Sequence, residues 1–324
     1  MSWSEIYLDG LAADTGFRRE TLEKVLRLGE LLADVSGHPL LSSALALKGG
    51  SALNLCFGSP ARLSVDLDFN YIGSVDRSRM LEERPLVERA VQQIASGRGY
   101  QIQKSRDEHA GRKYFLTYGS ASGSLDRVEV DLNFLHRVPL QPVSARKLWQ
   151  PGSGDEPIAN TVSLEEICGG KLCALLDRSM PRDLYDARRL PEVAGHILES
   201  ALFRALFIAM AAVLDHPLHA YGRDRLERVT DEDVRSQLHP MLSGDERPAA
   251  DELQESAWRV VAPLLSLNEP ERKFTDKIQR GELEPELLFP DEPEMVGRLR
   301  QHPALLWKTK NAREHAAKNP GRQR

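Results

Sequence analysis

Two carboxylates stand two positions apart in the stretch RLSVDLDFNY, residues 62–71, at Asp66 and Asp68. Apolar and polar residues alternate around them, which predicts a strand with both acids on one face, about 7 Å apart at the backbone. Carboxylates held so close repel each other unless a cation lies between them. Mg2+ or Mn2+ meets that need, because both ions prefer oxygen ligands. The pair therefore predicts a divalent metal site.

A third acid is expected from a second strand of the same pattern, RVEVDLNF, residues 127–134. Asp131 on its polar face is the natural third ligand, and Glu129, one step earlier on that face, ranks second. Three carboxylates on neighbouring strands predict metal-assisted phosphoryl or nucleotidyl transfer. The alternative is a solvated polar strand face, which explains one acid more easily than three.

A phosphate-binding turn is expected at Gly49, Gly50 and Ser51, shortly before the acid pair. Glycines at a helix start let the backbone approach a phosphate, whose oxygens accept hydrogen bonds from the free N–H groups. Ser51 is expected to cap a short helix over residues 52–57 and to add a hydroxyl to the cradle. Gly-Gly-Ser alone is a common turn, and its position beside the acids makes it informative.

A second cluster occupies GGKLCALLDRSMPRDLYD, residues 169–186. Lys171 and Arg178 are seven positions apart and share a helix face, while Asp183 and Asp186 share a face of the next helix. The combination predicts a nucleotide site in which cations bind phosphates and acids position the cations or bind base or ribose. The alternative is a helix hairpin held together by surface ion pairs.

The elements expected to position these residues fall into two groups. The first half shows helical spacing over 18–35 and 80–96 and strand alternation over 62–71, 100–107, 113–118 and 127–134. Prolines and glycines mark residues 138–160 as a linker or long loop. Helical spacing then covers residues 164–177, 182–190, 197–214, 218–238 and 249–267. We therefore expect a mixed α/β (α+β) domain over residues 1–150 and an all-α domain over residues 151–324.

Composition limits the protein class. With 324 residues, 41% hydrophobic residues and a net charge of −5, the chain has the make-up of a globular protein and not of one coated in nucleic acid. Residues 308–324 are locally basic, which fits either a solvated tail or a contact to phosphates. Three cysteines without ligand spacing, no secretory pattern and no bilayer-length apolar stretch predict a cytoplasmic protein without a membrane partner.

Several of these motifs occur in an order that resembles the AbiEii-type nucleotidyltransferase toxins, which include the MenT-like enzymes of toxin–antitoxin systems. The stretches that carry the resemblance are KGGSAL (residues 48–53), RLSVDLDF (62–69), and Lys171-Leu172 followed by RDLYD (182–186). The resemblance implies a polymerase-β-like nucleotidyltransferase core followed by a helical C-terminal domain. It also implies transfer of NMP from an NTP to the 3′ end of tRNA, and growth inhibition unless an antitoxin partner is present.

The resemblance also implies roles for individual residues. Gly50 and Ser51 match the pair that holds the triphosphate, Asp66 and Asp68 match the metal-binding pair, Lys171 matches an essential basic residue, and Asp183 matches the acid of the last motif. The third carboxylate is not defined by the motif, so Asp131 depends on the strand pattern. Which of Asp183 and Asp186 matters more stays open.

Two other functions remain compatible with the sequence. The first keeps the chemistry and changes the acceptor to a small molecule, such as an aminoglycoside, or to a protein side chain. The second is a non-catalytic NTP-binding module, which would bind nucleotide without releasing pyrophosphate.

Overall fold

The structure is a computed structural model, and it describes residues 3–106, 108–244 and 246–318. By the packing of its backbone the chain forms two compact units. The first unit contains residues 1–163 and 232–248, and the second contains residues 164–231 and 249–324.

A mixed sheet forms the centre of the first unit, in the order β3-β4-β5-β2-β1-β7-β6 within the described part of the chain. Its strands are β1 (Leu45–Lys48), β2 (Asp66–Tyr71), β3 (Gln101–Lys104), β4 (Gly111–Gly119), β5 (Leu125–Asn133), β6 (Ser144–Lys147) and β7 (Ile158–Thr161). The acid-bearing strands β2 and β5 are parallel neighbours, and β4 lies antiparallel to β5 on its other side. The sheet therefore brings together two strands separated by a long stretch of sequence.

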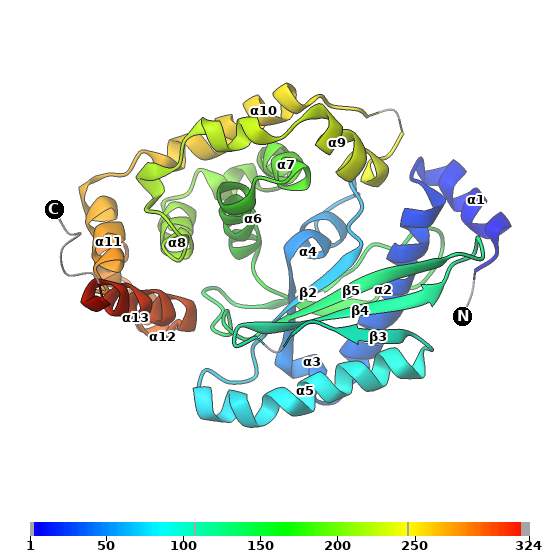
Figure 1. Ribbon diagram of the computed structural model, residues 1–324, viewed down its shortest axis with the longest axis horizontal. Coiled ribbons are helices and arrows are strands. Elements are labelled where there is room, and N and C mark those ends of the chain that lie inside the picture. The colour runs from blue at the N-terminus through cyan, green and yellow to red at the C-terminus, as the bar shows by residue number, and fades with distance from the viewer. Residues whose placement is uncertain (1–2, 107, 245, 319–324) are drawn as a thin grey trace. The chain divides into compact units, whose positions relative to one another are not determined.

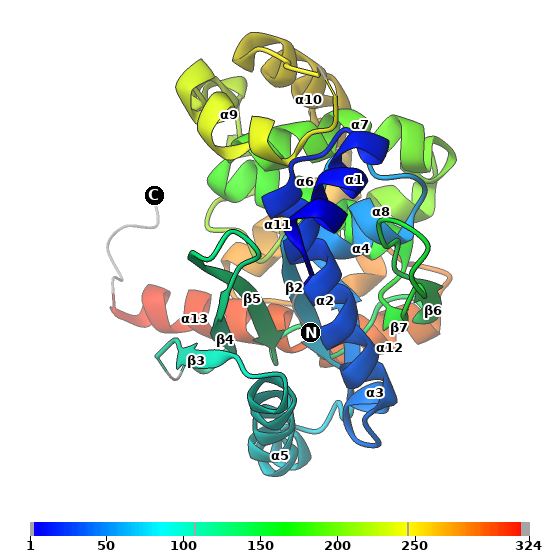
Figure 2. The ribbon, with the colours of Figure 1, turned by 90° about the vertical axis from the view of Figure 1, so that its right-hand side faces the viewer.

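Helices cover one face of this sheet. They are α2 (Arg19–Gly37), α3 (Leu41–Ala44) and α5 (Arg77–Gly97). The unit also contains α1 (Glu5–Thr15), which packs against α2, and α4 (Gly49–Cys56), which begins beside Asp68. In Figure 1, α2 crosses the strands β3, β4 and β5, and both views show α5 beside β3 (Figures 1 and 2). Alternate residues of β2 and β5, such as Leu67, Phe69, Val130 and Leu132, are buried in this layer. Their neighbours in sequence, including the acids, consequently project from the opposite face.

A later segment of the chain completes the first unit. Residues 232–248, which we call the return segment, contain α9 (Asp231–Gln237) apart from its first residue, and a 3-10 turn, His239–Met241. The backbone N–H of Leu63 donates to the carbonyl of Met241 at 2.8 Å, just before β2 begins. The hydroxyl of Thr21 in α2 donates to the carbonyl of Pro240 at 3.1 Å. The return segment thus connects α2 with the approach to the acid strand.

The second unit is helical, as expected. It contains α6 (Leu164–Arg178), α7 (Pro181–Leu198), α8 (Ala201–Ala211), α10 (Ala250–Leu265), α11 (Glu269–Gln279), α12 (Pro293–Gln301) and α13 (Pro303–Lys318), with short 3-10 turns between some of them. Large apolar side chains such as Phe203, Phe207 and Phe274 are fully buried among these helices. No helix in the described ranges combines the length and apolar character needed to cross a bilayer.

The structure differs from the expected elements at four points. The region 138–160 is not only a loop, because β6 and β7 form within it; strands of four residues are too short to show an alternation among the prolines. The first unit therefore extends past residue 150, since β7 pairs with β1. No continuous helix spans 218–238, because Gly222 is extended and separates two 3-10 turns. Ser51 does not cap α4, which already begins at Gly49.

The basic stretch at the end of the chain belongs to α13 as far as Lys318, while Arg322 and Arg324 lie outside the described residues. Lys308 is part of the fold, because its ammonium group donates to the carbonyl of Leu214 at 2.6 Å. Burial lowers the pKa of Lys308. This part of the stretch is therefore not simply a solvated tail.

Candidate active site

The predicted acids lie side by side in the first unit. Asp68 of β2 is the register partner of Asp131 of β5, and Asp66 is the partner of Glu129. Partners on adjacent strands point to the same face. Four carboxylates from two strands are therefore gathered on the face opposite the helices.

Lysines stand on both sides of this group. Across the sheet, Lys48 of β1 partners Asp68, and Lys113 of β4 partners Asp131. The ammonium group of Lys113 is 3.3 Å from the Glu129 carboxylate and 3.8 Å from that of Asp131. Burial alone would lower the pKa of Lys113, but the charges of Asp131 and Glu129 outweigh it and raise the pKa. Lys113 is therefore a stable cation beside the acids.

Sequence reasoning missed Lys113 because its place depends on the register of β4 against β5. The alternation of buried residues along β4 shows only that Lys113 lies on the solvated face. Which acids it meets is set by a pairing that joins Lys113 to Asp131, and no motif connects the two.

The glycine turn lies against the acid pair, as expected. Gly49 has a φ of 71° and begins α4 directly after β1. A methyl group added there would contact Asp68 closely, with the Cβ and Cγ atoms of Asp68 3.2 Å away. Only glycine permits both this conformation and this approach. The first turn of α4 thus places free backbone N–H groups next to Asp68.

Ser51 connects this helix to the acid strand. Its hydroxyl donates to the carbonyl of Asp66, and its side chain is fully buried. One carboxylate oxygen of Asp66 accepts a hydrogen bond from the hydroxyl of Ser64 at 2.8 Å. The Ser51 hydroxyl thus holds α4 and β2 together. The groups left for a phosphate are the backbone N–H groups of Gly49, Gly50 and Ser51.

Two of the three predicted metal ligands, Asp66 and Asp68, are placed so that they fit a metal ion. The described residues contain no group of three or more His, Cys, Asp or Glu side chains arranged to hold a metal ion. Asp131 is paired with Lys113 instead. Asp66 and Asp68 still offer two oxygen donors on one face, and Mg2+ typically takes one or two carboxylates while substrate phosphates and water fill the other positions.

The remaining predicted residues lie in the second unit and form ion pairs there. The ammonium group of Lys171 in α6 lies 2.7 Å from a carboxylate oxygen of Asp186 in α7. Both side chains are buried, with 9% and 0% of their surface exposed. A buried cation is stable only when it is paired, so Asp186 fixes the position of Lys171.

Arg178 and Asp183 form a separate pair. The guanidinium donates to both carboxylate oxygens of Asp183, at 2.8 and 3.0 Å. The backbone N–H of Met180 also donates to this carboxylate, at 3.2 Å, which caps the start of α7. The Asp183 side chain is buried, whereas that of Arg178 is 59% exposed. The Lys171–Asp186 pair is therefore buried, whereas the Arg178–Asp183 pair joins an exposed guanidinium to a buried carboxylate.

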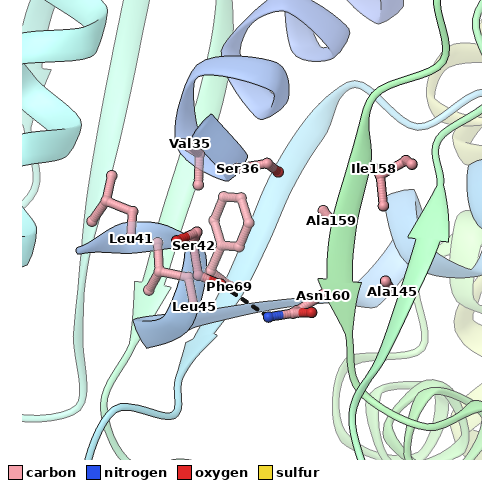
Figure 3. Close-up of a pocket in the computed structure, with 10 residues that line it drawn as sticks. All are labelled: Val35, Ser36, Leu41, Ser42, Leu45, Phe69, Ala145, Ile158, Ala159 and Asn160. Carbon is pink, nitrogen blue, oxygen red and sulfur yellow. Dashed lines mark hydrogen bonds between the residues drawn. The ribbon is translucent and has the colours of Figure 1, made fainter. Parts of the chain in front are cut away.

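A pocket of about 150 Å³ lies elsewhere in the first unit (Figure 3). It is lined by Val35, Ser36, Leu41, Ser42, Leu45, Phe69, Ala145, Ile158, Ala159 and Asn160. The amide of Asn160 donates to the carbonyl of Ser42 at 2.9 Å. Because Phe69 alternates with Asp68 along β2, this pocket is on the face opposite the acids and is not part of the candidate site.

Comparison with known proteins gives the family. Residues 30–279 match the model of the family described as nucleotidyl transferase AbiEii toxin, type IV toxin–antitoxin system. The chain belongs to this family. Among solved structures, the fold is similar to MenT4, a nucleotidyltransferase toxin from Mycobacterium tuberculosis H37Rv, with a TM-score of 0.65 and 18% identity over 92% of this chain and 99% of that one. No curated protein matches the sequence.

Family membership confirms the resemblance found in the sequence and the expected fold class, a mixed α/β core with a helical C-terminal part. It makes the chain a nucleotidyltransferase toxin of a toxin–antitoxin system, which implies an NTP substrate and an antitoxin partner.

Proposed function

We propose that this toxin transfers NMP from an NTP to the 3′ end of tRNA, releasing pyrophosphate and blocking translation until its antitoxin neutralises it. The observation that carries this proposal is the row of acids on β2 and β5 beside the glycine turn at the start of α4. Nucleotidyl transfer needs a binding place for the triphosphate and a group that activates the acceptor hydroxyl. The glycine turn supports the first, and the acids on β2 and β5 support the second. The reaction belongs in the cytoplasm, where tRNA and NTPs are found.

In the proposed reaction the acceptor hydroxyl forms a bond to the α-phosphorus. The bond between that phosphorus and the oxygen bridging to the β-phosphorus breaks, and pyrophosphate leaves with the electron pair. Asp131 is proposed to help activate the acceptor oxygen, as the proton acceptor or through a metal ion. The N–H groups of Gly49, Gly50 and Ser51 bind phosphate oxygens at the helix start.

Mg2+ or Mn2+, held by Asp66 and Asp68, would supply neutralisation of the triphosphate charge. From the second unit, Lys171 is proposed as the essential cation for the phosphates, kept in place by Asp186. Arg178, with Asp183, is proposed to contribute to nucleotide binding. We rank Asp186 above Asp183, because Asp186 holds the lysine.

A labelling assay tests the proposal. The purified protein is incubated with each of the four labelled NTPs, total RNA and Mg2+ or Mn2+. Wild type should label an RNA band of tRNA size, while Asp68→Ala and Lys171→Ala should lose transfer by about a hundredfold or more, as expected when a charge-stabilising group is removed.

Matched controls are Asp155→Ala and Lys273→Ala, because both residues are exposed and lie outside the candidate site. They should label RNA like wild type. Label on protein or on small molecules in place of RNA would show a different acceptor. NTP binding without pyrophosphate release would show a binding module, and full activity of Asp68→Ala would overturn the site.

A further inference from the structure

The sheet face that carries the acids continues outward onto β4 and carries an aromatic ring there. In register, Asp66 faces Glu129, and Glu129 faces Phe115 of β4. A second row runs beside it, from Asp68 through Asp131 to Lys113. Since neighbouring strands are about 4.8 Å apart, Phe115 lies about 10 Å from Asp66 at the backbone.

Phe115 is not a core residue. Its neighbours along the strand, Tyr114 and Leu116, are fully buried under the helices, whereas Phe115 is only partly buried on the open face. The guanidinium of Arg127, from β5, lies over its ring at 5.0 Å from the centroid. The two side chains are in cation–π contact on the open face of the sheet, close to the acids.

The charges around this contact are balanced. Glu129 lies 3.2 Å from Arg127 and 3.3 Å from Lys113, so one carboxylate orients both cations. With Asp131 included, this part of the face carries two positive and two negative side chains. Because the charges balance, this part of the face offers stacking on the ring and guanidinium more than general attraction between opposite charges.

We propose that Lys113, Phe115 and Arg127, together the stacking platform, bind the terminal nucleotide of the RNA acceptor. A base of the acceptor stacks on the Phe115–Arg127 pair, and Lys113 contacts the adjoining phosphate. The separation from Asp66 is of the order of one to two nucleotides, which brings the terminal hydroxyl toward the acid row. This proposal rests on the proposed transfer to RNA and adds the residues that hold the acceptor.

The test compares steady-state kinetics of wild type, Phe115→Ala, Phe115→Trp and Thr117→Ala, with RNA and NTP varied separately. Phe115→Ala should raise KM for RNA about tenfold or more, as for loss of a base–aromatic stack, and leave KM for NTP unchanged. Phe115→Trp should keep KM for RNA near wild type, because a larger ring still stacks. Thr117, on the same strand and face, is the matched control and should behave like wild type.

A separate measurement of RNA binding tests this proposal independently of the transfer reaction. Fluorescence anisotropy with a labelled tRNA is measured for Asp68→Ala and for the double variant with Phe115→Ala. Weaker binding by the double variant supports the stacking platform even if no RNA is labelled by wild type. Equal binding by both, or unchanged KM for RNA in a Phe115→Ala enzyme that labels RNA, overturns it; transfer to RNA would then stand without the platform.

Discussion

Gly49 lies directly against Asp68, so a side chain at this position would displace that carboxylate. Its φ of 71° and its approach to Asp68 both exclude a β-carbon. We expect Gly49→Ala to destabilise the protein by about 1–2 kcal/mol through backbone strain. It should also lower transfer by about a hundredfold, since displacing a catalytic group by about 1 Å costs that much.

Gly58→Ala is the matched control for this variant. Gly58 has a φ of 89°, and open space surrounds the position of its missing β-carbon. The backbone strain is therefore similar while no functional side chain is displaced. Labelled-NTP transfer and urea unfolding of both variants check the expectation. Equal losses of transfer in the two would show that strain alone, and not the contact with Asp68, is responsible.

Substitution of Asp183 and substitution of Asp186 should have different effects on stability and on transfer. Asp186→Asn removes the charge partner of buried Lys171, and breaking a buried pair costs about 3–5 kcal/mol of stability. Asp183→Asn weakens a cap and an exposed arginine contact, which costs about 1 kcal/mol. Transfer per folded molecule, with the folded fraction taken from circular dichroism, should fall further in Asp186→Asn. The reverse order would contradict the assignment of Asp186 to Lys171.

Individual residues of the candidate site could be predicted where the local pattern is strong. Alternation placed Asp66 and Asp68 on one face, and the structure has both projecting away from the helices. The partner of Asp131 could not be predicted, because Lys113 reaches it only through the register of two antiparallel strands. The pairing of Lys171 with Asp186, and not with Asp183, likewise depends on how α6 and α7 pack.

Two helices of the second unit are connected by a polar contact that the sequence does not suggest. Arg204 of α8 donates to both carboxylate oxygens of Glu271 in α11, at 2.6 and 2.7 Å. Burial alone would raise the pKa of Glu271, but the hydrogen bonds from Arg204 and from the N–H of Asn268 outweigh it and lower the pKa. The ionised carboxylate thus stabilises the folded state.

This shift gives a prediction for pH dependence. The stabilisation by Glu271 should be fully present above its ordinary pKa of 4.5 and should disappear as the pH falls through its lower pKa in the folded state. At neutral pH, Glu271→Gln should lower the free energy of unfolding by about 2 kcal/mol, as expected for the loss of a hydrogen bond to a charged group. Urea unfolding of wild type and variant over a pH series should show this difference shrinking in acid. A constant difference would contradict the pairing.

Among the elements, α5, β4 and β5 were predictable, whereas β6 and β7 were not. The expected helix over residues 80–96 and strands over 113–118 and 127–134 correspond to α5, β4 and β5. The strands β6 and β7 have four residues each, and β7 acquires its place by pairing with β1 on one side and β6 on the other. Such strands are defined by tertiary contacts, which leave no periodic signal in the sequence.

At the level of the chain, the return segment joins residues far apart in sequence into one unit. Leu242 within it is 2% exposed and pairs with Arg62, shortly before β2. We expect Leu242→Ala to cost about 2–5 kcal/mol, the usual range for a buried leucine. Because this packing supports the approach to β2, hydrogen exchange should increase in residues 66–71.

Leu253→Ala provides the comparison for this variant. Leu253 is fully buried in α10, which belongs to the second unit. Its replacement should increase exchange in α10 and leave β2 at the wild-type rate. If Leu242→Ala also left the exchange of β2 unchanged, the return segment would not support the acid strand.

The discontinuity of the first unit has a consequence for synthesis on the ribosome. The acids and the glycine turn are translated early, but the unit that holds them is complete only after residues 232–248 have left the exit tunnel. A nascent chain therefore carries the residues for transfer well before it has the contacts that order them. For a toxin of a toxin–antitoxin system, the late position of residues 232–248 in the sequence delays completion of this unit until synthesis is well advanced.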